Sequence, residues 1–162
     1  MKLTIATGLA IAGLVLAGTA LADTAPADVV WVDDVTIPAS LTGVPGSIDG
    51  GIAVATTASA GNCVACHEIA SLPHVEFQGN VGPALTGVAS RWNEAELRGI
   101  VVNAKHMFPE SRMPSFYRSD LAGYIRPGDV YTGRAANPET FGPILSAQQV
   151  EDTVAYLMTL TE

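Results

Sequence analysis

The sequence places two thiols and an imidazole within five consecutive residues. Cys63 and Cys66 are the two cysteines of the chain, and His67 directly follows the second of them. This is the C-x-x-C-H spacing that attaches haem c, in which each sulfur adds to a vinyl group as a thioether and the imidazole binds the iron. The sequence therefore predicts one covalent haem c, attached to Cys63 and Cys66 and ligated by His67.

Two other uses of closely spaced cysteines fit this sequence less well. A thioredoxin-like redox pair stands near a β-α-β pattern, which the sequence lacks. A structural zinc site generally needs four protein ligands, and the chain has no second pair of cysteines. Haem attachment is therefore the favoured interpretation of the motif.

The second axial ligand of the iron must come from elsewhere in the chain. The candidates are His74, His106, Met107, Met113 and Met158. His74 is expected in a surface loop, His106 and Met107 at the end of a helix, and Met158 in the core. We predict Met113, with Met107 as the alternative, because Pro114 favours an extended backbone that can present the Met113 thioether from a loop. His/Met ligation raises the reduction potential and closes the iron to substrates, which favours electron transfer.

A proline close to the motif has a predicted supporting role. A backbone carbonyl that accepts a hydrogen bond from a ligand histidine fixes the tautomer and orientation of the ring. We predict that the carbonyl of Pro83, in Gly82-Pro83, does this for His67. The alternative is that Gly82-Pro83 forms only a turn.

The sequence indicates helices around these residues. Two of them begin with capping boxes, in which a polar N-cap is followed three residues later by Glu or Gln. The pairs are Asn93 with Glu96 and Ser146 with Gln149. A shorter helix is expected over residues 48–60, whereas residues 61–92 are expected to form loops. Helices joined by long loops predict an all-α domain whose centre is filled by a prosthetic group.

The N-terminal region resembles an export signal followed by an arm. Lys2, a short apolar run and the small residues before Asp23 predict a signal peptide at residues 1–22 and a periplasmic protein without a membrane span. Residues 23–48 contain prolines and no helical period. We predict that they form an extended N-terminal arm, which lies on its own domain or on a partner, before a monohaem domain at residues 49–162.

The charge of the chain limits its partners. The formal net charge is −8 at pH 7. Nucleic acid is excluded as a partner because phosphate binding needs clustered Lys and Arg. A basic patch on a partner protein is compatible with this charge, although the acidity also serves solubility.

Four motifs together resemble the sulfur-oxidation cytochrome SoxX family, the smaller subunits of SoxAX complexes. The resemblance covers about residues 48–160. The motifs are Gly61-Asn62-Cys63-Val64-Ala65-Cys66-His67, Gly79-Asn80-Val81-Gly82-Pro83-Ala84-Leu85, Arg112-Met113-Pro114-Ser115-Phe116-Tyr117 and residues 145–157.

The resemblance implies a class I cytochrome c fold with Cys63, Cys66, His67 and Met113 as haem residues. It also implies a heterodimer with a SoxA-type cytochrome that carries the catalytic site of an L-cysteine S-thiosulfotransferase. Such a complex joins thiosulfate oxidatively to a cysteine of a sulfur-carrier protein. The SoxX-like haem then passes the electrons to a small cytochrome c.

Two alternatives to this function remain. The chain could be a free-standing periplasmic electron shuttle, which composition and haem motif do not distinguish from a subunit of a complex. The length of the chain favours the subunit. A ligand-binding or peroxidatic haem protein is the third possibility, and it requires an iron that Met113 does not close.

Overall fold

The computed structural model describes residues 22–120 and 142–162, so almost all of the predicted signal peptide lies outside the described residues. Within the described ranges the chain has four α-helices and two short 3-10 helices. The α-helices are α1 (Ile48–Thr56), α2 (Val88–Arg91), α3 (Glu94–Asn103) and α4 (Ala147–Leu157), and the 3-10 helices are η1 (Pro26–Asp28) and η2 (Cys63–Ala65). The described residues form one isolated β-bridge, between Val32 and Thr36, and no β-strand.

Both predicted capping boxes are present. The Asn93 side chain accepts from the backbone N–H of Glu96 at the start of α3, and the Glu96 carboxylate accepts from the N–H of Asn93. Ser146 and Gln149 make the same pair of bonds at the start of α4. These bonds satisfy N–H groups that the first turn of a helix leaves without partners.

The structure differs from the prediction in two helices. α1 ends at Thr56 rather than near residue 60. α2 lies inside the segment predicted as loop, and its single turn begins after Gly87, whose φ is 68°. Four residues are too few to show a helical period in sequence, which is why the pattern did not reveal α2.

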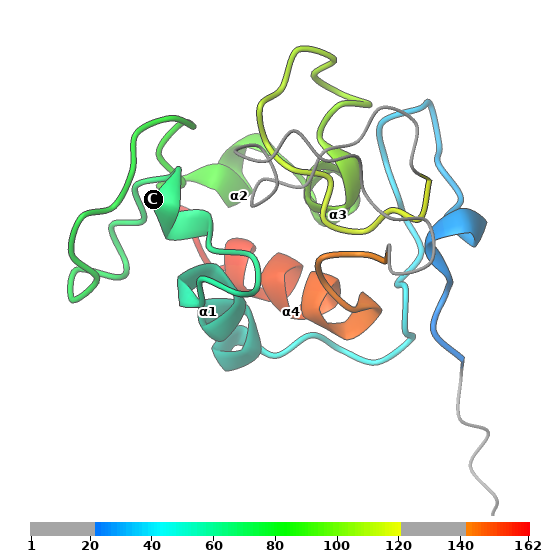
Figure 1. Cartoon of the computed structure of the whole chain (residues 1–162), viewed down its shortest axis with the longest axis horizontal. Coiled ribbons are helices and arrows are strands. Elements are labelled where there is room, and N and C mark those ends of the chain that lie inside the picture. The colour runs from blue at the N-terminus through cyan, green and yellow to red at the C-terminus, as the bar shows by residue number, and fades with distance from the viewer. Residues whose placement is uncertain (1–21, 121–141) are drawn as a thin grey trace, which may run out of the picture.

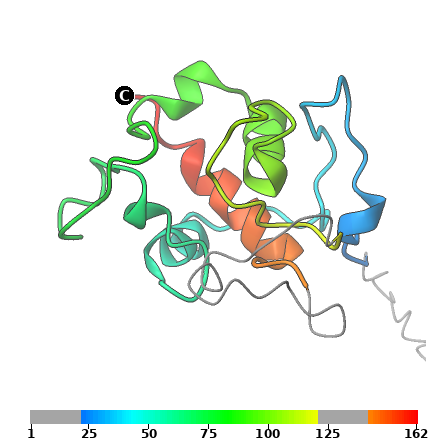
Figure 2. The ribbon, with the colours of Figure 1, turned by 45° about the horizontal axis from the view of Figure 1, so that its top comes forward.

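Helix α4 lies between α1 and α3 (Figures 1 and 2). α1 approaches it closely at Gly51, where a Cβ would lie 2.5 Å from the Cβ of Tyr156. The apolar face of α4 supplies Val150 and Val154 to the core. Met158, predicted as core, is instead 36% exposed, because it is the C-cap of α4 and lies past the last turn. No helix in the described ranges is both long and apolar enough to cross a membrane.

The N-terminal arm packs against its own chain. Ile37 and Leu41 are buried in the same hydrophobic core as the helices. The Trp31 ring stacks on the His106 ring, with centroids 3.9 Å apart and planes 6° from parallel. The start of the arm is also held, because the Tyr117 hydroxyl donates a hydrogen bond to the Thr24 carbonyl.

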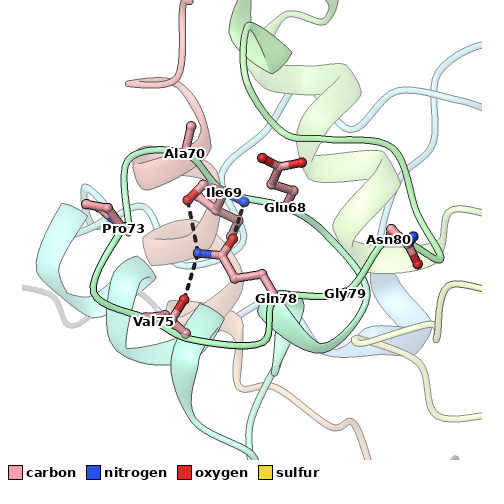
Figure 3. A pocket seen from close by; sticks show the side chains of 8 residues that line it. All are labelled: Glu68, Ile69, Ala70, Pro73, Val75, Gln78, Gly79 and Asn80. Atoms are coloured by element: carbon pink, nitrogen blue, oxygen red, sulfur yellow. Dashed lines mark hydrogen bonds between the residues drawn. The ribbon is translucent and has the colours of Figure 1, made fainter.

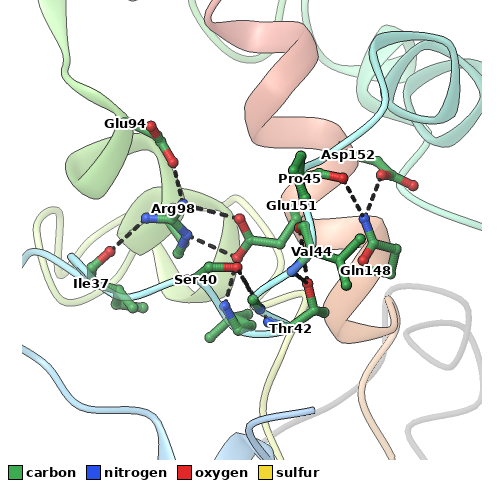
Figure 4. Close-up of polar contacts among 12 residues, drawn as sticks. Ile37, Ser40, Thr42, Val44, Pro45, Glu94, Arg98, Gln148, Glu151 and Asp152 are labelled. Atoms are coloured by element: carbon green, nitrogen blue, oxygen red, sulfur yellow. Dashed lines mark hydrogen bonds and ion pairs between the residues drawn. The ribbon is translucent and has the colours of Figure 1, made fainter. Parts of the chain in front are cut away.

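A buried ion pair joins the arm to α3 and α4 (Figure 4). Arg98 of α3 is 2% exposed and donates to both carboxylate oxygens of Glu151 of α4, at 2.9 and 3.0 Å. It also donates to the Ile37 carbonyl at 2.9 Å, and Glu151 accepts from the Leu41 N–H at 2.8 Å. Buried charges are tolerated when they are paired and hydrogen-bonded, and this pair fastens the arm to the helices.

Candidate haem site

The C-x-x-C-H motif forms a single tight turn around η2. Asn62, in the left-handed conformation, leads into Cys63. The N–H groups of Cys66 and His67 both donate to the Cys63 carbonyl, at 3.1 and 2.9 Å. These local bonds hold the two thiols and the imidazole at one place in the fold.

The Cys63 thiol lies in an environment that disfavours its thiolate form. Both cysteines are partly buried, and they are not joined to each other by a disulfide. Burial raises the pKa of Cys63 to about 11, so its sulfur stays protonated at neutral pH. The described residues contain no group of three or more His, Cys, Asp or Glu side chains that could hold a metal ion, so no structural zinc site is found among them.

The tautomer of His67 follows from its contact with Pro83. The Nδ1 atom of His67 lies 2.7 Å from the Pro83 carbonyl oxygen. A carbonyl oxygen only accepts hydrogen bonds, so Nδ1 carries the proton and Nε2 keeps the lone pair that can bind iron. The contact required by the predicted role of Pro83 is therefore present.

A second segment runs along the haem motif and holds it in place. Its N–H groups donate to two carbonyls of the motif and to that of Glu68, directly after it, at 2.8 to 2.9 Å. The bonds are Gly79 to Val64, Gly82 to Cys66 and Leu85 to Glu68. Gly82 also faces the His67 ring, since a Cβ there would lie 2.7 Å from Nδ1 and 2.8 Å from Nε2. The imidazole thus occupies the space that any other side chain at position 82 would fill.

Replacing Gly82 with alanine is therefore expected to displace the His67 ring and break its bond to Pro83. Overpacking of this kind costs about 1–3 kcal/mol of folding stability. Haem staining and the absorption spectrum should report less haem and altered iron ligation. Gly142→Ala is the matched control, because a Cβ at Gly142 meets nothing within 4 Å. An unchanged spectrum in Gly82→Ala would show that the ring does not depend on this close fit.

The other predicted ligand candidates differ in their surroundings. Met113 lies in a loop, is partly buried and packs against the hydrophobic core. His106 is engaged by the arm, since its ring stacks on Trp31 and its Nδ1 lies 3.1 Å from the Asp34 carbonyl oxygen. Met107 is partly buried, whereas His74 is exposed. These surroundings leave Met113 as the favoured candidate and Met107 as its alternative.

Gln78 is a structural residue of the site that sequence reasoning did not identify (Figure 3). Its amide oxygen accepts from the Ile69 N–H, and its amide nitrogen donates to the Leu72 carbonyl at 2.8 Å. Longer contacts of 3.3 Å reach the carbonyls of Ile69 and Val75. The side chain thus closes the loop that lines a cavity beside the haem motif. No local pattern marks a glutamine for this role, because its partners are the backbone of a non-repeating loop.

The residue before Gln78 faces the opposite way. Phe77 is 96% exposed and has a φ of 58°, a conformation that is rare for bulky residues. The Gln78 side chain is hydrogen-bonded within the loop, whereas the Phe77 side chain is exposed to solvent.

Comparison with known proteins agrees with this geometry. The cytochrome c family model matches residues 52–161. The crystal structure of SoxXA from P. pantotrophus contains a chain with 52% identity and a TM-score of 0.77, and the match covers 87% of this chain and 100% of that chain. No curated protein matches the sequence.

The chain belongs to the cytochrome c family, with the all-α class I fold and a covalently bound haem c. Within that family it is a SoxX-type cytochrome. The resemblance, the fold class and the cofactor predicted from the sequence are thereby confirmed.

Proposed function

We propose that this chain is the electron-transfer subunit of a periplasmic SoxAX-type heterodimer, in which a SoxA-type cytochrome carries the catalytic site. The main support is the match to SoxXA over the whole of the matched chain. In this proposal the complex couples thiosulfate to a cysteine of a sulfur-carrier protein. The chain passes the electrons to a small cytochrome c.

In this proposal Cys63 and Cys66 hold the haem through thioethers, and His67 and Met113 bind its iron. The residues suit the group: the two thiols lie in one tight turn, and the His67 ring is held at Nδ1 by the Pro83 carbonyl, which leaves Nε2 to bind iron. When bound, the haem supplies one-electron chemistry, and His/Met ligation favours its ferrous state. The chain contributes the orientation of the ligands, through Pro83, Gly82 and the loop of Met113.

The cysteine content supports a relay role. Joining thiosulfate to a thiol forms a sulfur–sulfur bond and releases a proton and two electrons, so it needs an electron acceptor. Both cysteines of the chain are used for haem attachment, which leaves none for sulfur chemistry. The reactive sulfur must therefore belong to a partner, and this chain takes up the electrons in two successive transfers.

We place the partner on the loop beside the haem motif rather than on the arm. The arm uses Ile37 and Leu41 in the core of its own domain. Phe77 and Val81, 96% and 72% exposed, lie on the segment that also carries Gly82 and Pro83. Electron transfer between two proteins weakens steeply with distance, so the partner cytochrome must approach the haem, and exposed aromatic side chains are common anchors of such interfaces.

Replacing Phe77 with serine is expected to weaken the complex with a SoxA-type cytochrome by about tenfold, the loss typical of a moderate anchor residue. Haem attachment and the spectrum should stay unchanged, since Phe77 points away from the fold. The measurement is the dissociation constant of the complex between the two purified holoproteins, by isothermal titration calorimetry or surface plasmon resonance. Val30→Ser is the matched control, because Val30 is exposed on the arm.

The same experiment tests the function itself. Failure of the unmodified protein to bind any SoxA-type cytochrome, with recovery as a lone monomer, would instead support a free electron shuttle. Normal binding of Phe77→Ser together with weak binding of Val30→Ser would place the partner on the arm.

A further inference from the structure

The carboxyl end of α3 lies against the loop that carries Met113. Three hydrogen bonds join the last residues of α3, and Lys105 directly after its C-cap, to the loop. They run from the Tyr117 N–H to the Val102 carbonyl at 3.2 Å, from the Ser115 hydroxyl to Asn103 Oδ1 at 2.6 Å, and from Lys105 Nζ to the Met113 carbonyl at 2.7 Å. The position of the loop is thus set by the end of α3 and by Lys105, two residues beyond it.

Lys105 is the member of this set that reaches Met113 itself. Its Nζ holds the carbonyl of Met113, while the N–H of Met113 donates to the Ser111 hydroxyl at 3.2 Å. Both backbone polar groups of Met113 are therefore held by side chains. Lys105 is partly buried, and burial together with the nearby charge of Arg118 lowers its pKa. The ammonium group thus lies where water compensates its charge less than at an open surface.

We propose that Lys105 is a positioning residue for Met113. By holding the Met113 backbone, Lys105 strengthens the bond between the thioether sulfur and the iron and raises the reduction potential of the haem. The proposal rests on the proposed ligation of the iron by Met113. Two physical effects support it. A charge-assisted hydrogen bond restricts the backbone that presents the thioether, and a fixed positive charge next to a ligand favours the less positive ferrous state of the iron.

The test compares holoprotein variants at position 105. Lys105→Met removes the charge and the hydrogen bond while keeping an unbranched side chain that is one heavy atom shorter. It is expected to bind imidazole at the ferric iron about tenfold more tightly, since loss of a charge-assisted bond has this order of effect. The red absorption band of methionine-ligated ferric haem should weaken and the potential should fall. Lys105→Arg keeps a charged donor and should retain the band and the potential.

Two further variants separate this proposal from the ligation on which it rests. Arg112→Met removes an equal charge from the exposed residue next to Met113 and should change imidazole binding little. Met113→Ala should abolish the red band. Met113→Ala could abolish the band while Lys105→Met keeps the band, the reduction potential and the imidazole affinity of the unmodified protein. In that case the proposed role of Lys105 is wrong, and the ligation of the iron by Met113 stands. If Met113→Ala leaves the band intact, both are wrong. Lys105→Gln serves the same comparison should Lys105→Met not fold.

Discussion

Replacing Met113 with alanine is expected to leave the haem covalently attached and to lower its reduction potential by on the order of 0.1 V or more, within the roughly 0.8 V that axial ligation spans. The thioether stabilises ferrous iron, and its loss leaves a coordination position for external ligands. Attachment should persist because the thioethers to Cys63 and Cys66 do not involve Met113.

Potentiometry and titration with imidazole or carbon monoxide measure these changes. Met107→Ala is the control, since Met107 is partly buried and lies six positions before Met113. This variant should keep the reduction potential of the unmodified protein, and its iron should stay closed to imidazole and carbon monoxide. The opposite pattern, with the effect in Met107→Ala and none in Met113→Ala, would assign the ligand to Met107.

Replacing Arg98 with methionine is expected to lower the free energy of unfolding by about 3–5 kcal/mol, because it leaves the buried Glu151 carboxylate without its counter-charge. The loss is a large fraction of the 5–15 kcal/mol that stabilises a typical domain. The substitution also removes the hydrogen bond that Arg98 donates to the Ile37 carbonyl, and this bond anchors the arm. Urea denaturation of the holoprotein gives the quantity directly.

Two companion variants sharpen this expectation. Glu94→Gln removes the other carboxylate that pairs with Arg98, but the Glu94 side chain is 61% exposed, so the expected cost is only about 0–1 kcal/mol. Arg98→Met combined with Glu151→Leu should be less destabilising than the sum of the two single variants, because no unpaired charge remains. Equal costs for Glu94→Gln and Arg98→Met would show that burial of the pair is not the source of the stability.

The ion pair also determines what removal of the arm is expected to do to the stability of the domain. Because Ile37 and Leu41 belong to the core and bind Arg98 and Glu151 through their backbone, deletion of residues 23–45 should destabilise the whole domain. Loss of partner binding in such a deletion would therefore not identify the arm as an interface. Single exposed substitutions such as Val30→Ser are the appropriate test of that surface.

The parts of the protein that the sequence determined by itself are local. The C-x-x-C-H turn is specified within five residues, because the spacing alone allows both thiols and the imidazole to meet one haem. The starts of α3 and α4 are specified within four residues, because each capping box closes its own hydrogen bonds. The Pro83 contact was predictable from chemistry, since a ligand histidine needs an acceptor for its second nitrogen.

Only the tertiary structure decided which distant groups meet. Helical periodicity shows that one face of a helix is apolar, but not that Arg98 finds Glu151 across the core, 53 residues away. It assigned Met158 to the core, although the end of α4 turns this residue outward. The engagement of His106 by Trp31 and the hold of Lys105 on Met113 depend in the same way on chain segments that fold back on one another. Such contacts follow from the packing of the whole chain, whereas a sequence pattern records the preferences of each segment separately.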